Sequence, residues 1–156
     1  MTSRQCFPCT ACCEGWLVTE VKGVKLKPGS PCVHCNETGC GIYSTRPENP
    51  CALFTCGWLD QPDKLPDHMK PSECGAIVRF RKWRDGHIIR ATPTGATIPG
   101  ETLDWLMAFA REYSLPLVFS EHLVEDGKFV GLKKTGYGPP PFIEYVETQM
   151  MHEDIM

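Results

Sequence analysis

Nine of the ten cysteines in this chain lie between Cys6 and Cys56, and this clustering constrains the fold more than any other feature of the sequence. Four of them form the run CxxCxxCC from Cys6 to Cys13. Such short spacings bring several sulfur atoms around one point, which is the arrangement that a metal ion or cluster requires. The sequence therefore predicts that metal bonds hold the N-terminal part together. The predicted metal ligands are Cys6, Cys9, Cys12, Cys13, Cys32, Cys35, Cys40, Cys51 and Cys56.

The rest of the composition is typical of a soluble globular protein: 156 residues, 42% hydrophobic and 22% charged. The net charge of -3 provides no global attraction to nucleic acid, and no run approaches the ~20 apolar residues of a membrane span. Residues 1–6 lack the apolar segment of a secretory signal. We therefore expect a cytoplasmic protein whose clustered cysteines stay reduced and act as ligands. A disulfide framework is the alternative, and adjacent Cys12 and Cys13 argue against it because neighbouring residues rarely bridge without strain.

The chain changes composition near residue 75, because all ten cysteines and eight of the fourteen prolines precede it. We expect residues 1–74 to be a cysteine-rich, loop-dominated metal-binding module, in which metal bonds replace a hydrophobic core. Residues 75–156 are expected to form a small α+β portion that packs against the module as one compact unit. The predicted fold is a small antiparallel ββαββ sheet with a terminal helix.

Alternating apolar and polar residues and the turn residues between them indicate where the elements of this fold lie. Val78 and Phe80 are predicted to share one face of a strand, with Arg79 and Arg81 on the other. The expected strands are 16–21 and 24–26, a hairpin of 76–83 and 87–91, and a hairpin of 117–123 and 129–132. A helix is expected over 103–113, with Thr102 as its cap and with Leu103, Leu106, Met107 and Ala110 as its apolar stripe. A second helix is expected over 142–151.

Zinc and a [4Fe–4S] cluster are the two cofactors that the cysteine spacing admits. Two cysteines separated by two residues can bind one ion from a tight turn, and the additional pair Cys32 and Cys35 favours zinc slightly. In the zinc interpretation, Cys6, Cys9, Cys32 and Cys35 form one site, and Cys12 or Cys13 forms a second with Cys40, Cys51 and Cys56. In the iron–sulfur interpretation, Cys6, Cys9 and Cys12 supply three ligands and Cys51 or Cys56 the fourth.

Three further residues are singled out near the cluster or outside it. His34 lies between two cysteines, where its ring is more suited to a hydrogen bond with a ligand or a carbonyl than to the metal itself. Arg46 could relieve the net charge of about -2 on a four-thiolate zinc site, or it could be a solvated turn residue. Cys74 is remote from the other cysteines and is expected to be a buried or incidental thiol.

Three motifs follow one another along the first part of the chain: the run Cys6–Cys13, the segment CGIYSTRP at 40–47, and CGWL at 56–59. This pattern resembles the CxxCxxCC family of zinc- or iron-chelating, YkgJ-like cysteine-cluster proteins, over residues 6–59. Two departures are the extra Cys35 and a segment before Cys51 that is one residue longer than usual. The resemblance implies eight ligands: Cys6, Cys9, Cys12, Cys13, Cys32, Cys40, Cys51 and Cys56.

Three functions are compatible with these features. The first is an intracellular metal-binding protein with a structural or accessory role, and the second is an iron–sulfur component that passes electrons to a partner. The third is a zinc-stabilised adaptor for a protein or nucleic acid. We expect a solvated, charged edge strand more than a nucleic-acid surface from the basic strip Arg79, Arg81, Lys82, Arg84, His87 and Arg90. No motif of a known catalytic site was found, so the sequence leans away from an enzyme.

Overall fold

The structure is a computed structural model of the chain, and it describes residues 57–61 and 63–150 together with the backbone of four short strands. These strands are β1 (Thr19–Val21), β2 (Val24–Leu26), β3 (Cys35–Asn36) and β4 (Gly39–Cys40). β1 pairs with β2 in antiparallel register, with Val21 opposite Val24, as the sequence predicts. β3 and β4 form a second antiparallel pair.

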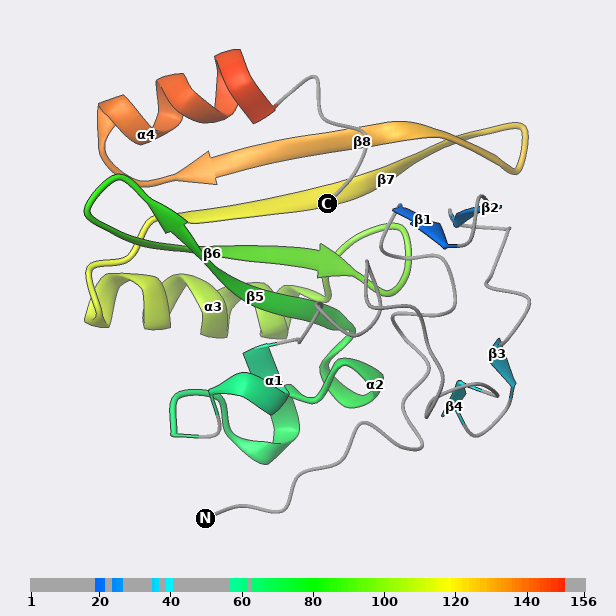
Figure 1. Ribbon diagram of the computed structural model, residues 1–156, viewed down its shortest axis with the longest axis horizontal. Coiled ribbons are helices and arrows are strands. Elements are labelled where there is room, and N and C mark those ends of the chain that lie inside the picture. Colours follow the sequence, from blue (N-terminus) through cyan, green and yellow to red (C-terminus); the bar gives the residue numbers. More distant parts are fainter. Residues whose placement is uncertain are drawn as a thin grey trace.

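A four-stranded mixed sheet forms the framework of the described part, which makes this part an α+β structure (Figure 1). The strand order is β5-β6-β7-β8, and the two outer pairs are antiparallel. The central strands β6 and β7 run parallel, so the expectation of an entirely antiparallel sheet is wrong at this point. The reason is the helix α3 (Gly100–Glu112) between them, because a crossover helix carries the chain from the last residue of β6 back to the end of the sheet at which β6 begins. The strands are β5 (Ala76–Trp83), β6 (Gly86–Pro93), β7 (Leu117–Glu125) and β8 (Lys128–Tyr137).

Both predicted hairpins are present, and each is longer than the sequence pattern indicated. In the β7–β8 hairpin the two turn residues, Asp126 and Gly127, have φ angles of 51° and 76°. Positive φ at both central residues matches the right-handed twist of the two strands, and Asp-Gly is a preferred pair for this turn. The local sequence therefore determines the register that aligns Glu125 with Lys128.

Helix α3 covers one face of the sheet (Figure 1). Leu106 and Ala110 are buried as predicted, and Leu103 and Met107 are partly buried. The prediction that Thr102 caps this helix is wrong, because the helix begins at Gly100 after Pro99. Thr102 lies inside the first turn, and its hydroxyl donates a hydrogen bond of 2.6 Å to the carbonyl oxygen of Cys74.

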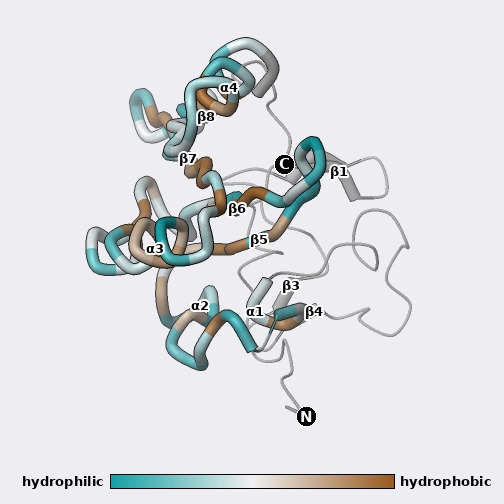
Figure 2. Tube along the Cα trace, turned by 90° about the vertical axis from the view of Figure 1, so that its left-hand side faces the viewer, coloured by the Kyte–Doolittle hydropathy of each residue, from teal (hydrophilic) through white to brown (hydrophobic). Residues whose placement is uncertain are grey.

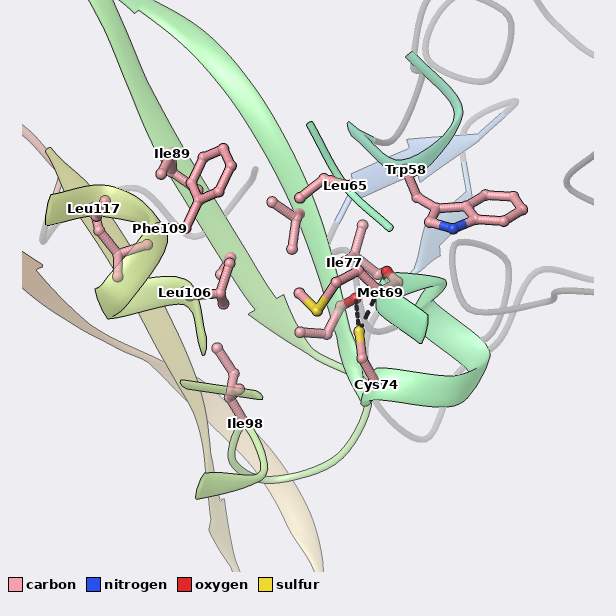
Figure 3. Close-up of a cluster of buried hydrophobic side chains, with 14 residues drawn as sticks. Trp58, Leu65, Met69, Cys74, Ile77, Ile89, Ile98, Leu106, Phe109 and Leu117 are labelled. Carbon is pink, nitrogen blue, oxygen red and sulfur yellow. Dashed lines mark hydrogen bonds between the residues drawn. The ribbon is translucent and has the colours of Figure 1, made fainter. Parts of the chain in front are cut away.

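The segment before the sheet belongs to the same hydrophobic core as the sheet and α3 (Figure 3). It contains the short helices α1 (Gly57–Asp60), η3 (Asp67–Met69) and α2 (Pro71–Cys74). Leu65 and Met69 are fully buried against residues of β5 and α3. The change of composition near residue 75 is therefore not a break in packing. The buried members of this core are Trp58, Leu65, Met69, Cys74, Ala76, Ile77, Val78, Ile89, Ala91, Ile98, Leu106, Phe109, Ala110 and Leu117.

The opposite face of the sheet carries the C-terminal helix, which was expected over 142–151. It consists of α4 (Pro140–Tyr145) and a π-helical continuation, η4 (Val146–Met150). Phe142 and Val146 bury Ile88 and Val118, which alternate along their strands with the residues that face α3. In Figure 2 α4 and α3 are seen as separate layers, with hydrophobic strand segments between them. No helix in the described ranges is long and apolar enough to cross a membrane.

Candidate metal centre

Most of the predicted metal ligands lie outside the described residues, so the structure tests their grouping at one place only. That place is the β3–β4 pair, where the backbone positions of Cys35 and Cys40 are directly opposite each other. Asn36 pairs with Gly39, so two residues, 37 and 38, connect the strands. The other predicted residues lie outside the described part: Cys6, Cys9, Cys12, Cys13, Cys32, Cys51, Cys56, His34 and Arg46.

The register of this short hairpin brings together two cysteines that are five positions apart in the sequence. Residues opposite each other in an antiparallel pair occupy the same face of the ladder, with Cβ atoms about 4.5–5.5 Å apart. A tight two-residue connection fixes such a register locally, without help from distant parts of the chain. The backbone thus assigns Cys35 and Cys40 to one face of one hairpin.

Within residues 57–61 and 63–150, no group of three or more His, Cys, Asp or Glu side chains is arranged to hold a metal ion. Cys74 is in this part, and it is a buried thiol that forms no disulfide, as the sequence predicts. Its Sγ donates to the carbonyl oxygens of Met69, at 3.4 Å, and Ala76, at 3.3 Å (Figure 3). Cys74 therefore functions as a small core residue between α2 and β5.

A second feature, which the sequence interpretation missed, is a set of buried polar side chains on the face of the sheet that carries α4. Arg90, at 5% exposed, and Lys134, at 6% exposed, are its most deeply buried charged members, and Arg79 is half-buried. Basic residues are almost never buried to this degree unless they are paired. We call this set the polar face, and it consists of Arg79, Arg90, Thr92, Ser120, His122 and Lys134.

Strand pairing explains why these residues meet. Arg79 lies directly opposite Arg90 across β5 and β6, and Ser120 lies opposite Lys134 across β7 and β8. In the parallel centre of the sheet, Arg90 pairs with Val118, two positions before Ser120. The polar face therefore crosses all four strands. The alternation of side chains along each strand would have predicted this set of residues if the parallel pairing of β6 with β7 had also been predicted.

Two members of the polar face are anchored by hydrogen bonds to the backbone. His122 lies with Nδ1 2.6 Å from the carbonyl oxygen of Gly95, and an acceptor there requires that Nδ1 carry the proton. The backbone N–H of His122 donates to Ala96, which holds the loop after β6 against β7. The Ser120 hydroxyl donates to the carbonyl oxygen of Ala91 at 3.4 Å. These contacts orient the polar side chains that lie beside the cations.

The basic strip predicted on the first hairpin divides into two parts. Arg81, Lys82, Arg84 and His87 are exposed, as expected for the charged edge of a sheet. Arg90 is buried and Arg79 is half-buried, so the prediction of a solvated strip is wrong for these two. Their burial depends on the tertiary packing of this face, which no local pattern encodes.

Comparison of the chain with models of protein families, with curated proteins and with solved structures finds no match. The resemblance to the CxxCxxCC family therefore stays a prediction from the three motifs of residues 6–59.

Proposed function

We propose that this chain is an intracellular metal-binding protein of the CxxCxxCC type, which holds zinc or an iron–sulfur cluster through its clustered cysteines in a structural or accessory role. The observation that carries the proposal is the pairing of Cys35 with Cys40 in a hairpin, within a segment that contains nine cysteines. The cytoplasmic location expected from the sequence is part of the proposal.

The backbone register is compatible with two ligands of one metal. In a tetrahedral site with zinc–sulfur bonds of about 2.3 Å, two thiolates lie about 3.8 Å apart. Opposed residues have Cβ atoms about 4.5–5.5 Å apart, so modest rotation about χ1 is enough to direct two sulfur atoms at one ion. The soft donor set, cysteine thiolates, fits both Zn2+ and an iron–sulfur cluster.

The same register favours a revised grouping of the ligands. The zinc interpretation of the sequence assigned Cys35 to a first site and Cys40 to a second. Their opposed positions support a single site that contains both, together with Cys32, which lies three residues before Cys35. A fourth thiolate would then come from one of the cysteines at 6–13 or 51–56. When bound, the metal supplies cross-links that a loop-rich segment lacks.

Metal analysis of anaerobically purified protein tests this function. Stoichiometric zinc in a colourless protein is expected if the role is structural, whereas brown protein with iron and acid-labile sulfide would favour the electron-transfer alternative. Full-chain protein with neither metal, and with cysteines that resist alkylation until a reductant is added, would refute the proposal in favour of a disulfide framework.

Two matched cysteine variants test the ligand assignment. Cys9→Ser is expected to lower bound metal and to destabilise the N-terminal part, because it removes one arm of the CxxCxxCC run. Cys74→Ser is expected to retain the metal, because the Cys74 thiol is hydrogen-bonded to carbonyl oxygens within the core. Equal metal content in the two purified variants would contradict the assignment.

A further inference from the structure

Positive charge is concentrated in the first hairpin of the sheet. Residues 76–93 contain five Lys and Arg residues and one acidic residue, Asp85, although the whole chain has a net charge of -3. The second hairpin, residues 117–137, contains three residues of each sign. Because β6 and β7 run parallel, the turns of the two hairpins lie at opposite ends of the sheet (Figure 1). The two ends of the sheet therefore differ in charge.

The cations nearest to the turn between β5 and β6 are exposed to solvent. Lys82 and His87 are directly opposite each other on the two strands. Arg81 lies opposite Ile88, whose side chain packs with α4, so Arg81 occupies the other face of the hairpin. Arg84 follows in the turn itself. We call this part of the sheet the basic end, and its cations are Arg81, Lys82, Arg84 and His87.

Arg84 has a backbone conformation that its residue type does not favour. Its φ angle is 54°, in the left-handed region that glycine, asparagine and aspartate occupy more readily than arginine. Charged residues within an edge strand protect it from pairing with other chains, which accounts for Arg81 and Lys82. Arg84 lies in the turn, beyond the paired residues of β5. An arginine kept in an unfavourable conformation at this place points to a function of its side chain.

The side chain of Arg84 lies over an aromatic ring. Its guanidinium carbon is 4.7 Å from the centroid of the Trp83 ring. Trp83 in turn contacts the fully buried Phe142 and the last residue of α4, Tyr145, with ring centroids 5.2 and 5.9 Å away. A guanidinium over a ring still presents the N–H groups of its rim, and two of them can donate to two oxygens of one phosphate. The hairpin and α4 thus preorganise a phosphate-binding group.

Two partly exposed aromatic rings accompany the cations. Trp83 alternates with Lys82 and therefore shares a face of β5 with Arg81. Tyr145 reaches the same place from α4, which the sequence of the hairpin alone does not indicate. Cations beside aromatic rings are the combination that holds single-stranded nucleic acid, because the cations contact phosphates while bases stack on the rings. An acidic protein would use the cations and leave the rings without a role.

We propose that the basic end of the sheet, together with the rings of Trp83 and Tyr145, binds single-stranded nucleic acid. Arg81 and Arg84 donate to phosphate oxygens, and a base stacks on the exposed side of Tyr145. Such contacts do not distinguish one base from another, so binding is expected to be independent of sequence and sensitive to salt. The proposal goes beyond the proposed function, since it assigns a second binding surface to the chain and makes no use of the metal.

Fluorescence anisotropy of a labelled RNA of about 12 uridines, and of the thymidine DNA of the same length, tests binding to the full-length protein. We expect a Kd of about 1–100 µM at physiological salt. The variant Arg81→Ala/Arg84→Asn is expected to bind about 10-fold or more weakly. Its slope of log K against log salt is expected to fall by about 1.4, because each phosphate contact to a single strand contributes about 0.7. Asparagine adopts a left-handed φ readily, so this variant is expected to fold.

The matched control is Lys128→Ala/Lys133→Ala, which removes two exposed charges of β8 that lie outside the basic end. It is expected to change the affinity by less than about 2-fold, since these lysines contact no phosphate in the proposed complex. Tyr145→Leu is expected to weaken binding about 5-fold or more, and Tyr145→Phe, which keeps the ring, is expected to retain it. Circular dichroism and thermal unfolding establish that each variant is folded.

Three results would overturn the inference. The first is absence of binding to both oligonucleotides at about 20 mM salt, where electrostatic attraction is strongest. The second is an equal loss of affinity in the two double variants, which would reduce the effect to net charge. The third is tighter binding of polyglutamate than of either oligonucleotide, which would assign the surface to an acidic protein. Binding of RNA or DNA by protein that contains no metal would refute the proposed function and leave the inference standing.

Discussion

The hydrogen bond from Thr102 to Cys74 links two helices that are far apart in the sequence, and its removal provides a defined perturbation. Thr102 lies in the first turn of α3, and Cys74 is the last residue of α2. Carbonyl groups at a helix C-terminus have no partner within the helix, and this hydroxyl donates to one of them. Thr102→Val keeps the shape of the side chain and removes only the donor.

The expected magnitude follows from the burial of both partners. Thr102 is 8% exposed, so water has little access to replace the hydroxyl. Leaving a buried acceptor unsatisfied costs about 1–3 kcal/mol. For a chain of this length, 1 kcal/mol corresponds to about 2–4 °C in the unfolding temperature. We therefore expect Thr102→Val to lower Tm by about 2–12 °C.

Thr102→Ser is the control, because it keeps the hydroxyl and removes one methyl group, at a cost of about 0.8 kcal/mol. Urea titration followed by circular dichroism, on protein with its metal content measured, compares the free energy of unfolding of the two variants. Thr102→Val is expected to be the less stable. A Thr102→Ser variant that is as destabilised as Thr102→Val, or a Thr102→Val variant within about 0.5 kcal/mol of the wild type, would refute the argument.

Two further predictions concern packing. Phe142→Ala is expected to lower the free energy of unfolding by about 3–5 kcal/mol, because Phe142 is fully buried. It is also expected to change the fluorescence of Trp83, because the two rings are in edge contact with their centroids 5.2 Å apart. Unchanged emission with unchanged stability would contradict the contact. Gly57→Ala is expected to cost about 1–3 kcal/mol, because its Cβ would lie 2.8 Å from the backbone oxygen of Val78. Gly86→Ala is the control, because a Cβ atom at Gly86 would have no other atom within 4 Å, and its free energy of unfolding is expected to stay within about 0.5 kcal/mol of the wild type in the same urea titration. Equal losses of stability in Gly57→Ala and Gly86→Ala would argue against the clash at Gly57.

The parts of the fold that local chemistry determines could be predicted from the sequence. Alternation between Val78 or Phe80 and Arg79 identified the two faces of β5, and the turn residues Asp126 and Gly127 identified the second hairpin. The helix between the hairpins was also recognised from its apolar stripe. These features depend on neighbours within a few residues, which is the range over which periodicity and turn propensity act.

Features that depend on distant parts of the chain were missed. The parallel pairing of Ile89 with Leu117 was not predicted, although a helix between two strands favours such a crossover. The start of α3 was misplaced because the Thr102 hydroxyl bonds to Cys74 rather than to its own helix. The burial of Arg90 follows from what packs on its face of the sheet. For the candidate metal centre, the cysteine spacing predicted the ligands, and the backbone register added only that Cys35 and Cys40 are opposed.

The parallel centre of the sheet has a consequence for the order in which the chain folds. Each outer hairpin pairs strands that are joined by a two-residue turn, and such pairs form within microseconds. The contact between β6 and β7 must instead wait until α3 has formed and closed a long loop. During synthesis, β5 and β6 emerge before β7 exists, so one side of β6 stays open until the second half of the sheet arrives. The polar face, which spans all four strands, is therefore complete only late in folding.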